Sequence, residues 1–488
     1  MQMDPIQLAL GFTLLGSVLI SAEELDFVHC ERVVRKWADS SSLEENISEN
    51  TRSLQDLLFF LHVPRTGGRT YFHCFLRKMY DSTDECPRSY DKLHFDPRKA
   101  RCKLLATHDD YSLMSELPRE KTSVMTIVRD PIGRVLSTYE FSVEVAARFL
   151  VHPNLTSATV MSARIRKPNA VSTLDIWPWK YLVPWMREDL FARRDARNAR
   201  GGVIIEGNNP YDMEDMLMPL HEYLDTPIAH DIIHNGATFQ IAGLTNNSHL
   251  SEAHKIRRCV QKFKSLGETV LQVAKRRLDT MLYVGLTEEH RESASLFAEV
   301  VGSQVLSRVV LNNATAKHKA AKPEPRVKIS ESRSGNGERQ NDASEVALDK
   351  AETKSENMTV KTLMEVYEGC ISNLRKSQAI RRVNSLKRIS PANFSKEARK
   401  KVPEDVIERI ITLNHLDVEI YKYAKGIFAK EHEQVSLKLV SRNELGRMFR
   451  EVDDEKLWKL ITVSLLVLLL FLFFLFVNAR RRTSKVKI

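Results

Sequence analysis

The sequence predicts an α/β domain with a mainly parallel sheet flanked by helices, followed by one C-terminal transmembrane helix. Over residues 54–311, short apolar runs alternate with amphipathic helical stretches, an alternation typical of a parallel sheet with crossover helices. Two of the apolar runs lead through polar loops into helices. Near the C-terminus, residues 460–477 (LITVSLLVLLLFLFFLFV) carry no charge. A helix of that length is just long enough to cross a bilayer.

The composition places few limits on function. The chain has 488 residues, 43% of them hydrophobic and 28% charged, with a net charge of +10. These values are ordinary for a folded protein, and the length allows one large core with appendages. The positive charge favours an anionic partner. It does not distinguish among a nucleic acid, a sulfated sugar, an acidic peptide and a nucleotide.

The N-terminus has the pattern of a secretory signal peptide. The apolar run Ile6–Ile20 is followed by Ser21-Ala22 and then by acidic residues, which predicts a signal peptide over residues 1–22. Asp4 and the lack of Lys or Arg before the run also leave an uncleaved segment open. Residues 23–53 are polar and predict a lumenal N-terminal segment.

The C-terminal charges predict the orientation of the chain in the membrane. Arg480, Arg481 and Arg482 follow the apolar run and belong on the cytoplasmic side, which makes residues 478–488 a cytoplasmic tail. The body then lies in the lumen, in a type I topology. The short span favours a thin early secretory or Golgi bilayer over the plasma membrane. Lumenal exposure agrees with six cysteines and with N-glycosylation sequons, the latter at Asn46, Asn154, Asn246, Asn313, Asn357 and Asn393. Six cysteines allow fifteen pairings, and the sequence selects none.

The region between the domain and the membrane has three parts. Residues 312–359 are rich in Lys, Glu, Ser and Asn with few large apolar residues, which predicts a disordered polar insert. Helical periodicity returns over residues 360–430 and forms one apolar stripe along Val402–Lys430, so this part is expected to complete the domain as helices. Residues 431–459 are charged and predict a stem.

The first informative loop follows the apolar run Leu57–Val63. A polar loop with two adjacent glycines leads into a helical pattern, and this arrangement directs backbone N–H groups and the positive helix end at an anion. The candidate binding residues are Arg65, Thr66, Gly67, Gly68, Arg69 and Thr70. The alternative is a plain strand-to-helix turn that happens to contain Gly-Gly. The loop lacks the G-x-x-x-x-G-K-[ST] pattern, which disfavours a nucleoside triphosphatase.

A second loop of the same kind follows the apolar run Val124–Val128. Arg129 stands at the carboxyl end of this predicted strand, where open α/β sheets bind ligands. Asp130 can cap a helix that has Pro131 at its first position. Arg129 and Ser137 are then placed to hold a second phosphate group.

Together, the segments L-H-V-P-R-T-G-G-R-T and R-D-P-I-G-R-V-L-S-T-Y resemble the 5′-phosphosulfate loop and the 3′-phosphate motif of Golgi sulfotransferases, with the pattern of the heparan sulfate 6-O-sulfotransferases. Residues 284–288 and 416–424 are similar to late segments of the same family. The resemblance covers roughly residues 55–311 and 402–430. It implies a sulfotransferase fold that uses 3′-phosphoadenosine 5′-phosphosulfate (PAPS), with no metal and no nucleic acid as partner.

The resemblance also implies roles for individual residues. Arg65 stands where the family has Lys, so it is expected to stabilise the leaving phosphate without readily donating a proton. Arg129 and Ser137 match the 3′-phosphate ligands. Arg134 is a secondary candidate that helix spacing could instead turn to solvent. His108, in a stretch similar to the family's G-L-H-A-D-W, is expected to be the catalytic base, although a His followed by two Asp residues is often a surface turn.

The expected acceptor is inferred from the membrane topology of the chain and not from any particular residue. A domain of this kind with a cleaved signal and a C-terminal span resembles the plant tyrosylprotein sulfotransferases. The expected acceptors are therefore tyrosines in acidic peptides or proteins of the secretory pathway. A heparan-type glycan 6-O-sulfotransferase is the alternative. A non-catalytic glycan receptor is disfavoured by the His108 match, and an ATP-dependent kinase by the lack of a recognisable Mg²⁺ loop.

Two further segments could bind the acceptor. The aromatic run Trp177-Pro178-Trp179 could form a platform for it, although packing in a core explains these residues as well. The basic run Arg193–Arg200 could attract an acidic peptide, and a solvated helix face explains it equally well.

Overall fold

The computed structural model describes residues 26–45, 53–87, 101–152, 173–202, 209–309, 358–390, 392–451 and 454–484. It divides into a body that ends at Phe428 and a C-terminal unit that begins at Ala429. The predicted signal peptide lies outside the described residues, as does the predicted polar insert apart from residues 358–359. The predicted domain boundaries stay predictions.

A parallel sheet of four strands forms the centre of the body, with the order β2-β1-β3-β4. The strands are β1 (Leu57–Leu61), β2 (Leu104–Thr107), β3 (Thr122–Val128) and β4 (Tyr283–Leu286). Every residue of β1 and β3 is buried, as expected for strands that are covered on both faces. The predicted α/β class with a parallel sheet flanked by helices is confirmed.

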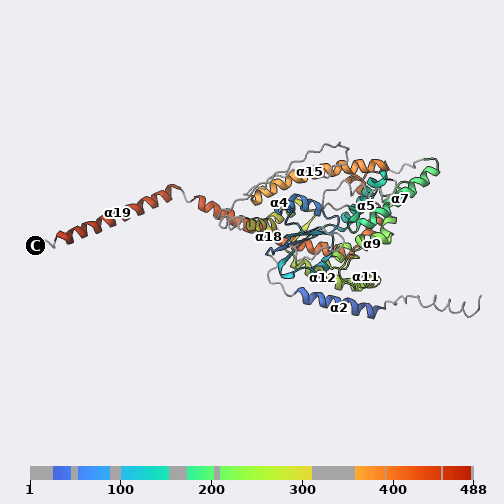
Figure 1. Ribbon diagram of the computed structural model, residues 1–488, viewed down its shortest axis with the longest axis horizontal. Coiled ribbons are helices and arrows are strands. Elements are labelled where there is room, and N and C mark those ends of the chain that lie inside the picture. Colours follow the sequence, from blue (N-terminus) through green and yellow to red (C-terminus); the bar gives the residue numbers. More distant parts are fainter. Residues whose placement is uncertain are drawn as a thin grey trace, which may run out of the picture. The chain divides into compact units, whose positions relative to one another are not determined.

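Helices lie on both sides of this sheet. In Figure 1, α15 and α4 lie on one side, and α2, α11 and α12 lie on the other. The helices of the described part of the body include α2 (Phe27–Glu45), α3 (Gly68–Tyr71), the π-helix η2 (Phe72–Leu76), α4 (Arg77–Met79), α5 (Pro131–Arg148), α7 (Trp179–Ala199), α8 (Leu220–Asp225), α9 (Pro227–Ile233), α10 (Gly236–Ile241), α11 (Ala253–Lys262), α12 (Gly267–Thr280), α13 (His290–Phe297), α15 (Val360–Leu386), α16 (Lys396–Arg399), α17 (Glu404–Leu413) and α18 (His415–Glu451), whose later part belongs to the C-terminal unit.

Helix α5 begins as the sequence predicts. The Asp130 carboxylate accepts a hydrogen bond of 2.8 Å from the backbone N–H of Gly133, and Pro131 occupies the first helical position. An N-cap carboxylate and an N1 proline both stabilise a helix start. The helix runs from the carboxyl end of β3 into a second hydrophobic core shared with α7, α8 and α9, in which Tyr139 and Trp179 are buried. The start of α5 is therefore fixed beside the sheet edge.

The apolar stripe predicted along Val402–Lys430 is carried by two helices, because α17 ends and α18 begins on either side of Asn414. Asn414 is fully buried. Its side-chain oxygen accepts from the backbone N–H of Asn235 at 3.1 Å, and its side-chain nitrogen donates to the carbonyl of Ile410 at 2.9 Å. Asn bonds readily to nearby backbone groups and so competes with helix continuation. The tertiary contact to Asn235 is invisible in the hydrophobic pattern.

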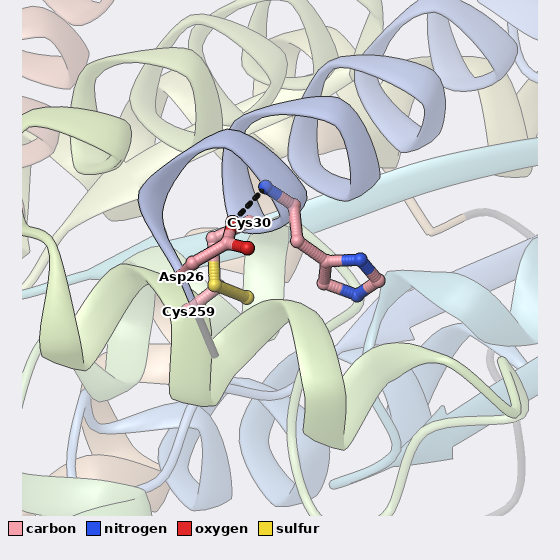
Figure 2. The surroundings of a disulfide bond; sticks show 4 residues. Asp26, Cys30 and Cys259 are labelled. Atoms are coloured by element: carbon pink, nitrogen blue, oxygen red, sulfur yellow. Dashed lines mark hydrogen bonds between the residues drawn. A yellow bond between two sulfur atoms is a disulfide. The ribbon is translucent and has the colours of Figure 1, made fainter. Parts of the chain in front are cut away.

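Three disulfide bonds join segments that the sequence alone did not pair. Cys30–Cys259 connects α2 to α11, as Figure 2 shows. Cys74–Cys370 connects η2 to α15, and Cys86–Cys102 closes a short loop. The polar segment 23–53 therefore contains a helix, α2, that is bonded covalently to the body. Free cysteines are absent from the described residues.

The C-terminal unit contains the end of α18 and a separate helix, α19 (Asp454–Ser484), which covers the predicted span. Among the helices of the described part of the chain, none has both the length and the apolar character that a bilayer crossing requires. The transmembrane helix stays a prediction.

Candidate active site

One edge of the sheet gathers the polar residues that the sequence singled out. Because all four strands are parallel, their carboxyl ends meet at this edge, the place where ligands bind in open α/β folds. Arg65 follows β1, His108 follows β2, Arg129 follows β3 and Thr287 follows β4. The strand order places the loop after β1 between the other two candidate segments.

The loop after β1 has a backbone that glycine makes possible. Arg65 has a φ of 68° and Gly67 a φ of 82°, so both lie in the left-handed region that few non-glycine residues adopt. A Cβ added to Gly68 would lie 2.2 Å from Cδ2 of His62, and no side chain fits there. The strained φ of Arg65 is the kind of backbone outlier that clusters at functional sites.

The two predicted motifs meet directly at Arg65. Its Nε donates to Oγ of Ser137 at 3.0 Å, and Nη1 of Arg129 donates to the backbone carbonyl of Arg65 at 3.1 Å. Burial, with a smaller contribution from the charge of Arg129, lowers the pKa of Arg65 to about 10. The guanidinium therefore stays protonated at neutral pH, and it connects the loop after β1 to helix α5.

His108 lies at the end of β2 with its ring held in one orientation. Its Nδ1 donates to the backbone carbonyl of His62 at 2.8 Å, and the two imidazole rings stack with centroids 4.2 Å apart. Since the carbonyl can only accept, Nδ1 carries the proton and Nε2 carries the lone pair in the neutral ring. Burial lowers the pKa of His108 to about 4, against an opposing effect of this hydrogen bond. The ring is therefore a neutral proton acceptor at physiological pH.

Comparison with known proteins decides the family. A scan against protein-family models finds no match. The chain is 74% identical to the "Protein-tyrosine sulfotransferase" of Arabidopsis thaliana, over the full length of both chains. The chain belongs to the protein-tyrosine sulfotransferase family. It is an enzyme, a sulfotransferase, and the sheet edge described above is its candidate active site.

Two residues of this sulfotransferase site were not singled out from the sequence. The hydroxyl of Thr287 donates to the backbone carbonyl of Thr66 at 2.7 Å and so fixes the loop after β1. Glu288 Oε1 lies 3.6 Å from Nε of Arg129, and its Oε2 accepts from the N–H of Asp130 at 3.3 Å. Both residues fall in the V-G-L-T-E segment after β4, whose family resemblance was the available signal.

Arg134 has a structural place in the sulfotransferase. Its Nη2 lies 2.7 Å from Oδ2 of Asp417, and both side chains are only 1% exposed. The same carboxylate accepts the backbone N–H of Ala237 at 3.2 Å and that of Thr238 at 2.8 Å. Arg134 therefore joins α5 to α18 and α10. It is neither exposed to solvent nor placed to bind a phosphate.

Residues 177–179 and 193–200, the two segments that could bind the acceptor, contact other parts of the protein. Trp177 and Trp179 are buried, and Nε1 of Trp177 donates to Asp231 at 3.0 Å. Along α7, Arg193 pairs with Asp189 at 3.0 Å and with Glu222 at 2.8 Å. These contacts favour the packing explanation of the tryptophans and reduce the charge that the basic run presents to solvent.

Acidification from pH 6.5 toward pH 4 is expected to lower the free energy of unfolding of this sulfotransferase. Burial lowers the pKa of His108 to about 4 and that of His62 well below its ordinary value. As pH falls, the unfolded chain binds protons at these histidines before the folded chain does. The contribution of these histidines to the free energy of unfolding is therefore fully present above their pKa in the unfolded chain. It is lost as the pH falls toward their lower pKa in the folded chain. Each histidine contributes a slope of at most about 1.4 kcal/mol per pH unit.

Urea unfolding at pH 7, 6 and 5 measures this slope. His108→Gln removes one of the buried histidines whose pKa is lowered, so its free energy of unfolding should fall less steeply than that of the wild type. His290→Gln, at an exposed position on α13, is the matched control and should keep the wild-type slope. Equal slopes for the wild type and His108→Gln would contradict the buried, neutral state of His108.

Proposed function

We propose that the enzyme transfers the sulfuryl group of PAPS to tyrosine hydroxyls of secretory-pathway proteins, and that His108 and Arg65 carry the chemistry. The observation that supports this most directly is that the two motifs meet at Arg65. Its side chain donates a hydrogen bond to Ser137, and its backbone carbonyl accepts one from Arg129. The 5′- and 3′-phosphates of PAPS are attached to one ribose, so its two phosphate sites must be neighbours. The contacts of Arg65 satisfy this requirement.

The residues present fit such a nucleotide. The tight backbone at Gly67 and Gly68 lets phosphate oxygens approach the loop amides, with Arg65, Thr66, Arg69 and Thr70 around it. The Nε atom of Arg129 is buried and has no hydrogen-bond acceptor, since Glu288 Oε1 lies 3.6 Å from it. A bound phosphate oxygen would supply the missing hydrogen bond. We assign the 5′-phosphosulfate to the loop after β1 and the 3′-phosphate to Arg129 and Ser137.

The proposed reaction is an in-line sulfuryl transfer. Nε2 of His108 takes the proton of the tyrosine hydroxyl while the tyrosine oxygen forms a bond to sulfur. At the same time the bond from sulfur to the 5′-phosphate oxygen breaks. The products are tyrosine O-sulfate and adenosine 3′,5′-bisphosphate. The leaving phosphate gains negative charge, which the Arg65 guanidinium stabilises. Cationic stabilisation comes from arginines, so we expect no metal requirement.

The low pKa of His108 suits a base that gains its full strength only when the donor nucleotide is bound. A base with a pKa near 4 is neutral but weak. The anionic phosphosulfate group, bound beside it, would raise this pKa because nearby negative charge favours the protonated ring. The base would then approach its optimum strength when the donor is in place.

We further propose that the enzyme is a single-pass type I protein of the Golgi membrane with its catalytic body in the lumen. Three disulfide bonds support a body that folds in an oxidising compartment. The signal-peptide pattern and the charged tail after residues 460–477 support the orientation. The net charge of +10 supports acceptors with acidic residues around the tyrosine.

An acceptor assay tests the proposed function. The full chain in detergent is given PAPS labelled with ³⁵S and either an Asp-Tyr peptide or desulfated heparan. We expect label in the peptide and none in the glycan. A peptide with Phe in place of Tyr is the control for the acceptor atom, and one with Asn in place of Asp reports the acidic preference. Label confined to heparan would make the enzyme a glycan sulfotransferase, and label in neither would overturn the proposal.

A further inference from the structure

One face of helix α5 collects arginine side chains from several parts of the chain. Ser137, Glu140, Phe141 and Glu144 are spaced so that they share this face. Arg65, from the loop after β1, donates to Ser137 at 3.0 Å, and its guanidinium lies 4.3 Å from the ring centroid of Phe141. Glu140 and Glu144 are the carboxylates of the same face, within two turns of Ser137.

Two arginines from the C-terminal helices bind these carboxylates. Arg399 of α16 donates through Nε and Nη2 to the two oxygens of Glu140, at 2.7 and 2.8 Å. Arg382 of α15 donates to Glu140 at 3.1 Å and lies 3.5 Å from Glu144. The side chain of Glu140 is 1% exposed, whereas those of Arg399 and Arg382 are 29% and 31% exposed. A buried carboxylate therefore fixes two guanidinium groups that still reach solvent.

The bidentate contact determines how Arg399 can act. It engages the Nε–Nη2 edge of the guanidinium, and the planar group then presents Nη1 on the side away from Glu140. The hydroxyl of Tyr211 also donates to Glu140, at 2.8 Å, which fixes the carboxylate itself. The hydrogen bonds and the positive charges of Arg399 and Arg382 outweigh burial and lower the pKa of Glu140. Glu140 is therefore an ionised anchor.

The positive charges around Glu140 exceed the negative ones. Among the described residues, five guanidinium groups interact with three carboxylates of this cluster, and Asp130 acts on Arg129 as a fourth. The arginines are Arg65, Arg129, Arg148, Arg382 and Arg399, and the carboxylates are Glu140, Glu144 and Glu288. Burial lowers the pKa of Arg129, and the charge of Arg399 is the next largest cause. Partly buried cations without enough counter-charge favour an anionic ligand between them.

We propose that Arg399 is a further ligand of the 3′-phosphate of the donor nucleotide, with Arg382 beside it and Glu140 as the positioning residue that orients both. The inference rests on the proposed function, which supplies the nucleotide. Arg129 and Ser137 are the two residues assigned to that phosphate. The charge of Arg399 lowers the pKa of Arg129, and Arg399 is held by Glu140, which lies within one turn of Ser137. The C-terminal helices thereby complete a site that the two sequence motifs begin. The disulfide Cys74–Cys370 joins α15 to the helix after the first loop and supports this arrangement.

Two nucleotides that differ only in the 3′-phosphate test the proposal. Binding of adenosine 3′,5′-bisphosphate and of adenosine 5′-monophosphate is measured by calorimetry on the full chain in detergent. Arg399→Gln is expected to weaken the bisphosphate about 10- to 100-fold, the loss expected for a charge-assisted hydrogen bond, and to leave the monophosphate unchanged. Arg399→Lys, which keeps a charge for Glu140, should show a smaller loss of the same kind. The matched control is Arg388→Gln, at an exposed arginine just after α15, and it should bind both nucleotides like the wild type.

Unchanged monophosphate binding by Arg399→Gln also shows that the variant is folded. Equal weakening of both nucleotides, or no weakening of the bisphosphate, would overturn the role of Arg399. A raised KM for an acidic peptide with unchanged nucleotide affinity would also overturn it and would assign Arg399 to the acceptor. If the wild type itself binds the two nucleotides equally, the 3′-phosphate site of the proposed function fails together with this inference.

Discussion

Replacing His108 with alanine is expected to lower kcat by about 10²- to 10⁴-fold, the usual contribution of a positioned base, while adenosine 3′,5′-bisphosphate still binds with nearly the wild-type affinity. The proton of the tyrosine hydroxyl must leave as the new bond to sulfur forms. The orientation of the His108 ring, with Nδ1–H bonded to the carbonyl of His62, leaves Nε2 as the atom that would accept this proton in the proposed mechanism. Steady-state kinetics with a tyrosine peptide and calorimetry with the bisphosphate measure the two quantities.

Two controls separate loss of the base from loss of the fold. His290→Ala removes an exposed histidine and should leave kcat unchanged. Added imidazole should restore part of the activity of His108→Ala, because it can occupy the space of the missing ring and accept the proton. A kcat within about threefold of the wild type would show that His108 is not the base. A variant that no longer binds the bisphosphate would show that the side chain holds the nucleotide site together instead.

The parts of the fold that the sequence predicted are those specified by local chemistry. Largely apolar runs predicted the two buried strands β1 and β3 because both faces of a parallel strand are covered. Asp130 and Pro131 predicted the start of α5 because capping involves neighbouring residues only. The Gly-Gly pair predicted a tight loop, and the structure supplies the reason, since the ring of His62 fills the space of a Cβ on Gly68.

The parts that the sequence did not predict depend on residues that are distant along the chain. The cysteine pairs and the strand order are of this kind, and so is the break at Asn414, which follows from a contact with Asn235. Helical spacing indicated which residues share a face of α5. It could not show that Arg134, one turn before Ser137, meets Asp417, or that Glu140 anchors arginines from beyond the polar insert. Family resemblance singled out the first two motifs, and the geometry added Thr287 and Glu288.

Replacing Arg65 with alanine is expected to lower kcat by about 10²- to 10³-fold, as observed when a preorganised donor to a developing negative charge is removed. The guanidinium is preorganised by the bond to Ser137 and by its stacking on Phe141. It thus needs little reorganisation as the leaving phosphate gains charge. Rapid-quench kinetics with labelled PAPS, at saturating donor, isolates the transfer step from donor binding.

Arg65→Lys separates charge from geometry at the same position. Lysine restores the positive charge and can donate a proton to the leaving phosphate, but it has no planar group to stack on Phe141 and bond to Ser137 at once. We therefore expect its transfer rate to lie between those of the wild type and Arg65→Ala. Arg77→Ala, at an exposed arginine of α4, is the matched control and should transfer at the wild-type rate. If Arg65→Ala kept more than about a tenth of that rate, the charge on the leaving phosphate would have to be stabilised by other groups, and Arg69 in the same loop would be the first to test.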